Sequence, residues 1–248
     1  MKALITGASS GIGRDMAKVL GEKGFDLVIV GRNKERLEEV KSQINTNVEI
    51  ITMDLAPEEN CEELYKKVKD VDVLINNAGF GTFGKFTETS LETELEMIKT
   101  NIIAVHTLTK LYLQDMVKKD KGYILNVASI AGFLPGPLMA TYYSTKAYVL
   151  RLTQGLQEEL KKQKSNVKIS VLCPGPTATD FLSRAGVKFK TKSASSEYVA
   201  EYGIEKMLKG KKVIVPTVKI KCARVLCKIV PDTILAKFAY SVQEKRKK

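Results

Sequence analysis

The amino-acid sequence predicts an α/β protein with a doubly wound, parallel sheet of seven strands between two layers of helices. Three observations support this prediction. Short apolar runs alternate with amphipathic segments along most of the 248 residues, as in repeated βαβ units. A glycine-rich turn follows the first run, and small or polar residues follow several others. Because ligands of such sheets bind beyond the carboxyl ends of the strands, these residues are the first candidates for a functional site.

The first half of the chain alternates regularly between strand and helix. Ala3, Leu4 and Ile5 form a short buried run, and each later run of this half is followed by a charged amphipathic segment. In the third of these segments, Leu64 and Val68 lie on one helical face. The predicted strands are residues 3–5, 26–30, 48–53 and 71–75, and the predicted helices are residues 15–23, 34–44 and 58–69.

The second half continues the same pattern with longer helices. Pro174 and Pro176 end the sixth strand, and residues 177–194 lack periodicity and have the length of a functional loop. We therefore expect a catalytic domain over 1–216, with a substrate loop at 177–195. The remaining predicted strands are 122–127, 167–172 and 213–215, and the helices are a long, interrupted region at 91–119, then 141–162 and 196–208.

The composition is that of one soluble globular domain, with 44% hydrophobic and 27% charged residues. No apolar stretch approaches the ~20 residues that span a bilayer, and Met1 leaves no room for a signal peptide before the first strand. Four cysteines without a C-x-x-C pair favour a reducing compartment, and a single histidine disfavours a zinc site. We therefore expect a cytoplasmic protein without a metal.

The turn at residues 6–13, TGASSGIG, favours a dinucleotide site. Its glycines permit a sharp turn and a close approach to a ligand, and the N-terminus of the next helix can face a phosphate. The spacing G-x-x-x-G-x-G differs from the common G-x-G-x-x-G fingerprint. One alternative is a purely structural turn. Another is a hydrolase nucleophile elbow, G-x-S-x-G at 7–11, which is disfavoured because the serine follows the first strand and the only histidine, His106, lies in a helical segment.

A serine, a tyrosine and a lysine that follow the fifth strand form a candidate acid/base group. Ser129 lies at the carboxyl end of that strand, and Tyr142 and Lys146 are spaced i, i+4 on the next helix, so they share one face. A tyrosine pKa of about 10 is too high for a base near neutrality, but a nearby ammonium favours the phenolate and lowers it. Tyr-x-x-x-Lys alone occurs by chance on many helices. The serine and the glycine turn make the functional interpretation the better one.

Together the glycine turn, Asn76-Asn77-Ala78-Gly79, Asn101, Ser129, Tyr142-x-x-x-Lys146 and Pro174-Gly175 resemble the motifs of the classical short-chain dehydrogenases/reductases. The resemblance covers residues 1–215, with the order and spacing of that family. It implies a Rossmann-type fold with seven parallel strands and a nicotinamide cofactor. The C-terminal ending is similar to that of the subgroup described as DltE-like.

The resemblance implies a role for each catalytic residue. Tyr142 resembles the acid/base, and Ser129 the group that orients the substrate oxygen. Lys146 resembles the residue that binds the nicotinamide ribose and lowers the tyrosine pKa, and Asn101 the one that holds a water in a proton relay. Tyr143 is expected to have no such role, because only Tyr142 has a lysine four residues later.

The resemblance also implies which residues bind the cofactor. Asp54 resembles the residue that hydrogen-bonds adenine, Asn76 and Ala78 those that line the adenine ribose, and Thr177 and Thr179 those that contact the nicotinamide carboxamide. The full set of expected cofactor-binding residues is Gly7, Ser9, Ser10, Gly11, Ile12, Gly13, Arg32, Asn33, Asp54, Leu55, Asn77, Ala78, Gly79, Tyr142, Lys146, Pro174, Gly175, Thr177 and Thr179.

The end of the second strand predicts NADP(H) as the cofactor. Enzymes that prefer NAD place an acidic residue there for the ribose 2′-hydroxyl, whereas an arginine accommodates the 2′-phosphate. Here the strand ends in Val30-Gly31-Arg32-Asn33, without an acid. We expect Arg32 to be the main phosphate contact, with Ser9 and Asn33 as helpers. The alternative is a solvated arginine.

The formal net charge of +12 is concentrated at the C-terminus. Residues 217–248 contain nine Lys or Arg residues and only two acidic ones, Asp232 and Glu244. Apolar residues recur there at helical spacing on both sides of Pro231, which predicts two basic amphipathic helices. Such stripes favour packing against the protein's own body or a sister subunit, covering the substrate pocket. Attachment to an anionic membrane surface remains the alternative.

The leading hypothesis is an NADP-dependent oxidoreductase that moves a hydride between nicotinamide and a carbonyl or secondary alcohol. A non-catalytic dinucleotide sensor is the rival, since fold alone does not establish activity. A nucleic-acid binder is disfavoured because no recognition motif is present. The resemblance to the short-chain dehydrogenases/reductases also implies a homodimer or homotetramer. The residues Phe80, Phe83, Phe133, Leu134 and Tyr143 indicate either an apolar substrate pocket or ordinary core packing.

Overall fold

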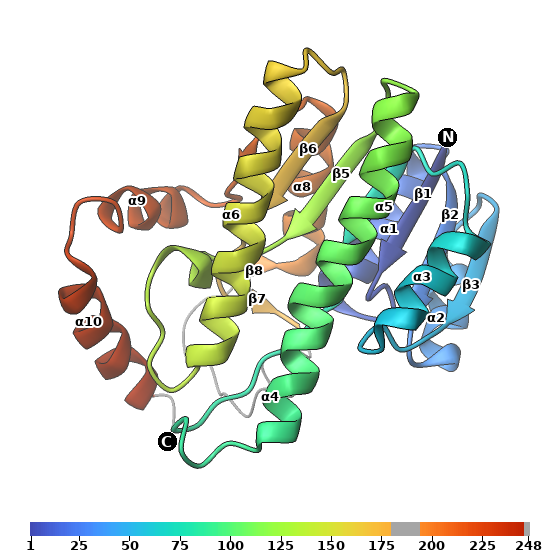
Figure 1. The fold of residues 1–248 in the computed structure, drawn as a ribbon. Coiled ribbons are helices and arrows are strands. Elements are labelled where there is room, and N and C mark those ends of the chain that lie inside the picture. Colours follow the sequence, from blue (N-terminus) through green and yellow to red (C-terminus); the bar gives the residue numbers. More distant parts are fainter. Residues whose placement is uncertain (180–193, 246–248) are drawn as a thin grey trace.

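A parallel sheet of seven strands forms the centre of the computed structural model, which describes residues 1–179 and 194–245 (Figure 1). The strand order is β3-β2-β1-β4-β5-β6-β9, and all neighbouring pairs are parallel. The order reverses between β1 and β4, where a crevice forms at the carboxyl ends of the strands. The strands are β1 (Lys2–Thr6), β2 (Asp26–Gly31), β3 (Val48–Thr52), β4 (Val73–Asn76), β5 (Tyr123–Val127), β6 (Lys168–Leu172) and β9 (Val213–Ile214).

Helices cover both faces of this sheet, so the predicted three-layer architecture is confirmed. The helices of the Rossmann-type body are α1 (Gly11–Glu22), α2 (Lys34–Lys41), α3 (Glu58–Lys67), α4 (Leu91–Ile98), α5 (Ala104–Lys118), α6 (Ala140–Lys162) and α8 (Ser196–Leu208). A π-helical turn, η1 (Lys99–Ile103), joins α4 to α5, and a 3-10 turn, η2 (Ile130–Phe133), follows β5. A small parallel pair, β7 (Thr177–Ala178) and β8 (Ala194–Ser195), lies beside α8.

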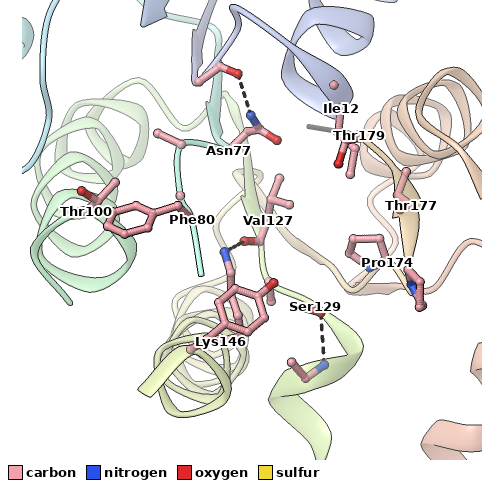
Figure 2. A pocket seen from close by; sticks show the side chains of 18 of the residues that line it. Ile12, Asn77, Phe80, Thr100, Val127, Ser129, Lys146, Pro174, Thr177 and Thr179 are labelled. Carbon is pink, nitrogen blue, oxygen red and sulfur yellow. Dashed lines mark hydrogen bonds between the residues drawn. The ribbon is translucent and has the colours of Figure 1, made fainter. Parts of the chain in front are cut away.

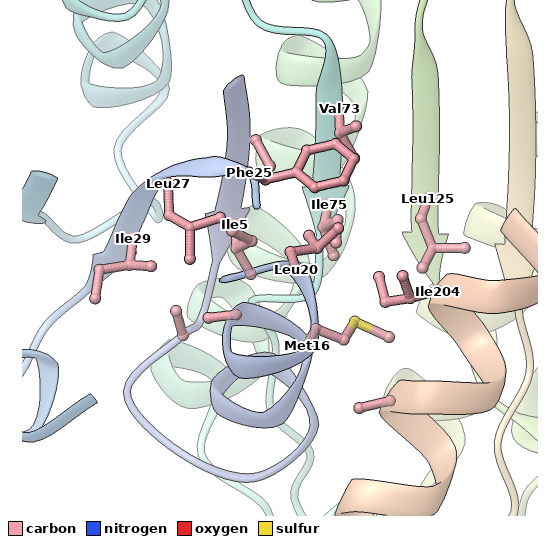
Figure 3. Packing of buried hydrophobic residues seen from close by; sticks show 14 of the residues in the cluster. Ile5, Met16, Leu20, Phe25, Leu27, Ile29, Val73, Ile75, Leu125 and Ile204 are labelled. Atoms are coloured by element: carbon pink, nitrogen blue, oxygen red, sulfur yellow. The ribbon is translucent and has the colours of Figure 1, made fainter. Parts of the chain in front are cut away.

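The alternation of strand side chains divides the core in two. Ile5 of β1 packs with Met16 and Leu20 of α1 and with Ile204 of α8 on one face (Figure 3). Leu4, the neighbour of Ile5, points to the opposite face, where the core includes side chains of α3 and α5. Both clusters are fully buried, which fixes the register of the strands and hence the position of every residue at their carboxyl ends.

The clearest difference from the sequence prediction is the start of the first helix. Helix α1 begins at Gly11, four residues before the expected start, because the glycine turn runs directly into the helix. The long region at 91–119 is interrupted, as predicted, and the interruption is the π turn η1. Of the expected substrate loop at 177–195, residues 180–193 lie outside the described residues, as do 246–248 of the basic end.

The C-terminal segment forms two helices, α9 (Val218–Leu226) and α10 (Asp232–Glu244), as expected. Pro231 separates them and precedes the first turn of α10. Figure 1 shows that this pair extends along one side of the body, beside α6. Within the described residues, neither of these helices nor any other is long and apolar enough to cross a membrane.

Candidate active site

The glycine turn between β1 and α1 forms a cradle that side chains would fill. Gly7 and Gly11 have φ angles of +66° and +55°, a conformation that side chains rarely adopt. A Cβ atom at Gly11 would lie 2.8 Å from the Thr179 side chain, and one at Gly13 would lie 2.3 Å from the carbonyl oxygen of Gly7. The backbone amides at the start of α1 therefore face the space beyond the sheet, where an anion is stabilised by the helix terminus.

Hydrogen bonds join this turn to the end of β4. The Thr6 hydroxyl accepts from the backbone amides of Asn77 and Ala78, at 3.0 and 3.1 Å. The Asn77 side chain donates to the carbonyl oxygens of Thr6 and Gly7, at 3.1 and 3.0 Å (Figure 2). Asn77 and Ala78 are therefore held at the switch point between β1 and β4.

The expectation that Asn76 lines the adenine ribose is wrong. Its side chain is buried and donates to Thr109 and Asn126, at 3.0 and 2.9 Å. Among the described residues that line the cavity, Asn77 and Ala78 are present and Asn76 is not. The reason is that Asn76 is still part of β4 and is held in a buried hydrogen-bond network, whereas Asn77 and Ala78 follow the end of the strand.

A cavity of about 590 Å³ extends along the carboxyl ends of the strands, from the glycine turn to α6 (Figure 2). Its length and the glycine cradle fit a dinucleotide, with the phosphates at the start of α1. All the expected cofactor-binding residues line it except Gly13, which packs against Gly7 and Asn77. Arg32, Asn33, Asp54 and Leu55 lie at one end, where the expected adenosine half would bind.

The groups at this adenosine end already have protein partners. The Arg32 guanidinium donates to the Glu96 carboxylate of α4 at 3.0 Å, and both side chains are about half exposed. Asn33 caps α2 by accepting from the Arg36 amide at 2.7 Å. Asp54 accepts from the Ala56 amide at 3.1 Å. Arg32 is therefore close to the cavity but balanced by an acidic neighbour.

Ser129, Tyr142 and Lys146 meet at the other end of the cavity. Ser129 follows β5 and caps η2 by accepting from the Ala131 amide at 3.1 Å. Lys146 donates to the carbonyl oxygen of Val127 at 3.0 Å, a bond drawn in Figure 2. The i, i+4 spacing on α6 places Tyr142 and Lys146 on one face, as predicted, and Lys146 Nζ lies 5.8 Å from the centre of the Tyr142 ring.

Burial dominates the electrostatics of this end. Burial raises the pKa of Tyr142, although a hydrogen bond with the Ser129 side chain lowers it in part. Burial also lowers the pKa of Lys146 to about 8. Among the protein's own groups, the net shift of the Tyr142 pKa is therefore opposite to the one expected from its lysine neighbour. The Tyr-x-x-x-Lys spacing indicates the nearby ammonium, but the desolvation that shifts both pKa values depends on the assembled site.

Asn101 is not among the described residues that line the cavity. It is in the π turn η1 and fully buried. Its amide accepts from the Phe80 backbone amide at 3.1 Å and donates to the Phe80 carbonyl oxygen at 2.9 Å and to the Thr145 hydroxyl at 3.1 Å. The π turn aims this side chain at α6, a common use of π-bulges at functional sites.

The C-terminal helix α10 borders the end of the cavity beyond Tyr142 and contributes four lining residues there. Leu235, Ala239 and Gln243 are buried at i, i+4, i+8, and Gln243 donates to the Tyr143 hydroxyl at 2.8 Å. The side chains that line this end are Phe80, Leu134, Met139, Tyr143, Phe238, Ala239, Val242 and Gln243. The expectation that the tail packs on the body and covers the pocket is thus met by α10.

Two of the aromatic residues expected in the substrate pocket have other neighbours. Phe83 packs against the buried cluster that contains Met97 and Met139. Phe133 packs near the buried Val149 cluster, with the Arg224 guanidinium 5.6 Å from its ring centre. His106 is exposed on α5 and contacts Tyr148 at 2.7 Å, away from the cavity. Of the five residues expected in an apolar pocket, Phe80, Leu134 and Tyr143 therefore line the cavity and Phe83 and Phe133 do not.

The fold and the site define a dinucleotide-binding α/β protein with a serine, a tyrosine and a lysine at one end of its crevice. The family model described as short chain dehydrogenase matches residues 1–188, and the chain belongs to this family. The identification from motifs alone is confirmed at the family level.

Relatives with sequence similarity are oxidoreductases. An uncharacterized oxidoreductase of Staphylococcus epidermidis is 36% identical over 181 residues, covering 71% of this chain and 78% of that protein. A very-long-chain 3-oxoacyl-CoA reductase of Mycosarcoma maydis is 38% identical over 181 residues, covering 68% of this chain and 51% of that protein.

Solved structures of the family superpose well on the model. A short-chain dehydrogenase from Sphingobium yanoikuyae in complex with NADPH has a TM-score of 0.81 at 28% identity, covering 93% of this chain and 96% of that one. A short chain dehydrogenase/reductase from Burkholderia phymatum in complex with NAD has a TM-score of 0.82 at 24% identity, covering 91% and 92%, and shows the shared fold.

Proposed function

We propose that the protein is an NADP(H)-dependent oxidoreductase that interconverts a carbonyl group and a secondary alcohol on an apolar substrate. The observation that carries this proposal is the meeting of Ser129, Tyr142 and Lys146 at the end of a cavity that begins at a glycine cradle. The apolar side chains of the substrate end favour a substrate with a hydrophobic body. The bound nicotinamide would supply or accept the hydride.

The protein's own residues would handle the proton. In the reductive direction, the hydroxyls of Ser129 and Tyr142 would hold the substrate oxygen, and Tyr142 would give its phenolic proton to that oxygen as the carbonyl carbon becomes an alcohol carbon. Lys146 would donate to the nicotinamide ribose and stabilise the phenolate left behind. The raised pKa of Tyr142 suits this role, because a protonated phenol is the form that must be present first.

Asn101 would act on the site without lining the cavity. We propose that it holds the proton-relay water expected from the family resemblance, in the region between Phe80 and Thr145 that its amide connects. Its bond to Thr145, whose hydroxyl donates to the Tyr142 carbonyl oxygen at 2.7 Å, would also position the acid/base on α6.

NADP(H) is proposed over NAD(H) because Arg32 is the charged residue at the end of β2 and no acidic residue follows that strand directly. A 2′-phosphate at this end would meet the guanidinium of Arg32, with Ser9 and Asn33 near it in the cavity lining. We also propose the other cofactor contacts expected from the family resemblance, because these residues line the same cavity. They include Asp54 for adenine and Thr177 and Thr179 for the carboxamide.

A homodimer or homotetramer in the cytoplasm is proposed as the working form. Leu91 and Leu95 of α4 are exposed on the side of the long helices, a feature that favours a subunit contact. All four cysteines are unpaired in the described chain, which suits a reducing compartment. A DltE-like subgroup membership stays a prediction from the motifs of the ending.

The test measures activity and cofactor binding separately. A panel of ketones, aldehydes and acyl substrates of increasing apolar size is assayed with NADPH and with NADH, and the two dissociation constants are measured by fluorescence titration. We expect turnover of an apolar carbonyl and tighter binding of NADPH. NADPH binding without turnover of any substrate in either direction would favour the rival, a dinucleotide sensor. Equal affinities for the two cofactors would refute the choice of NADP(H).

A further inference from the structure

Helix α9 has two faces of different character, and its inner face is already used by the body. Ile220 lies next to Gly175, where a built Cβ atom would be 2.8 Å from the isoleucine side chain. Arg224 lies over the Phe133 ring. Ala223 and Cys227 are half-buried on the same side. These residues are spaced i, i+3, i+4, i+7, so one helical face is docked on η2 and the end of β6.

The opposite face of α9 is apolar and exposed. Val218, Cys222, Val225 and Leu226 occupy it, and Ile229 lies exposed in the turn that follows; we call these five residues the outer stripe. Val218 and Ile229 are 72% and 76% exposed, and Val225 and Leu226 are each 57% exposed. Within the described part of the chain, none of the α9 residues is buried. A helix that only packed on its own body would direct its large apolar side chains inward.

Lysines border the outer stripe on both sides. At 100° per residue, the part of the stripe on α9 is centred between Val218 and Cys222, with Lys219 on one edge and Lys221 on the other. Lys228 lies next to Ile229 in the turn after the helix. Lys221 also donates to the Tyr202 hydroxyl at 3.2 Å. An apolar face with Lys or Arg at its borders is the pattern of a helix that lies in a lipid interface.

We propose that the outer stripe of α9 docks into the interface of an anionic lipid bilayer, with the bordering lysines on the lipid headgroups. Charge selects this occupant over a second copy of the chain. Residues 217–248 hold nine Lys or Arg residues against two acidic ones, so an isologous contact between two stripes would bring like charges together. An anionic leaflet offers the opposite charge and an apolar layer beneath it.

This docking goes beyond the proposed oxidoreductase function and needs no opening of the site. The inner face of α9 stays on the body, and α10 keeps Leu235, Ala239 and Gln243 buried over the cavity. Catalysis of a water-soluble substrate is therefore expected to be the same with and without lipid. Membrane binding can be measured independently of activity.

The test is co-sedimentation of the full-length protein with vesicles of phosphatidylcholine alone or mixed with phosphatidylglycerol, at low and high salt. The triple variant Val225→Ser/Leu226→Ser/Ile229→Ser removes the apolar stripe, and Lys219→Gln/Lys228→Gln removes charge beside the stripe on α9 and in the turn after it. The matched control is Phe86→Ser, which removes an exposed apolar side chain from the loop before α4 instead. Circular dichroism and thermal melting check that each variant is folded.

We expect binding to the anionic vesicles that falls with salt and is absent from the neutral ones. The triple serine variant should bind at least about ten-fold more weakly, because large apolar side chains no longer leave water. The lysine variant should lose roughly five-fold for each charge. The control should bind like wild type.

Three outcomes would overturn the proposal. The first is no binding to anionic vesicles at low salt, and the second is equal binding by wild type and the triple serine variant. The third is a change of oligomeric state in the triple serine variant, measured by light scattering, without a change in vesicle binding. That third result would assign the outer stripe to a second copy of the chain.

Discussion

The side-chain amide of Gln243 donates a hydrogen bond of 2.8 Å to the hydroxyl of Tyr143, and this bond ties the C-terminal helix α10 to helix α6. The two residues are 100 positions apart in the chain, and Gln243 is almost completely buried. Tyr143 directly follows the proposed acid/base Tyr142. The C-terminal segment is therefore part of the substrate end of the cavity and not a detached tail.

We expect the Gln243–Tyr143 bond to contribute about 1 kcal/mol to the free energy of unfolding, the usual net value for a hydrogen bond in a folded protein. A double-mutant cycle of Gln243→Leu and Tyr143→Phe, measured by urea unfolding, gives this coupling directly. Ser241→Ala is the control, because its exposed hydroxyl contacts only the backbone of α10. A coupling near zero would mean that the bond does not hold α10 in place.

The two neighbouring tyrosines also provide a matched test of the acid/base assignment. Tyr142→Phe should lower turnover by about 10²–10⁴-fold, because it removes the phenolic proton that the proposed mechanism transfers to the substrate oxygen. Its affinity for NADPH should remain close to that of wild type, since the dinucleotide contacts are retained. Tyr143→Phe removes the same hydroxyl one residue later and should keep most of the turnover. Turnover of Tyr142→Phe close to wild type would remove Tyr142 from the mechanism.

Local patterns were enough to predict most of the fold and the catalytic face. The glycine turn, the strand ends and the i, i+4 pair Tyr142 and Lys146 depend on periodicity and spacing within single elements. Because parallel strands bring their carboxyl ends to one edge, these separate motifs were expected to meet, and in the structure they line one cavity.

The remaining features depend on tertiary packing that no local pattern encodes. The partner of Gln243 is set by how α10 docks, and the position of Asn101 is set by a π turn whose sequence, KTNII, has no distinctive signal. The buried partners of Asn76, Thr109 and Asn126, come from α5 and β5 and cannot be inferred from β4 alone. The direction of the Tyr142 pKa shift depends on burial, which is a property of the assembled site.

Glu96, like Gln243, was not predicted from the sequence to lie near the site. We expect its carboxylate to weaken cofactor binding. Its carboxylate pairs with Arg32 at 3.0 Å, and a 2′-phosphate would compete for the same guanidinium. Glu96→Gln should therefore tighten NADPH binding by roughly two- to five-fold, the range for an exposed ion pair, and leave NADH binding unchanged.

Arg32→Ala is the complementary variant for this prediction. It should weaken NADPH binding and bring the two dissociation constants close together, and Glu96→Gln should then have little further effect in the Arg32→Ala background. If Glu96→Gln changed NADPH and NADH affinities equally in wild type, the carboxylate would act on the whole site and not through the arginine. Fluorescence titrations of the four proteins measure all these quantities.

The buried ammonium of Lys146 should leave a signature in the pH dependence of stability. Its pKa is about 8 in the folded protein and about 10.5 in an exposed lysine. Between these values the unfolded chain binds more protons than the folded one, so the contribution of Lys146 makes the protein more stable as the pH rises. Below pH 8 both states carry the proton, and the cost of burying the charge is present in full.

The comparison of wild type with Lys146→Met isolates this contribution from the groups remote from the site, which titrate alike in both proteins. The free energy of unfolding of wild type minus that of the variant should increase between pH 8 and 10.5, with a slope of at most about 1.4 kcal/mol per pH unit. Urea unfolding of the cofactor-free proteins in this pH range measures it. A difference that stays constant or falls would show that Lys146 is not desolvated, and that the ammonium is more exposed than its position beneath Tyr142 implies.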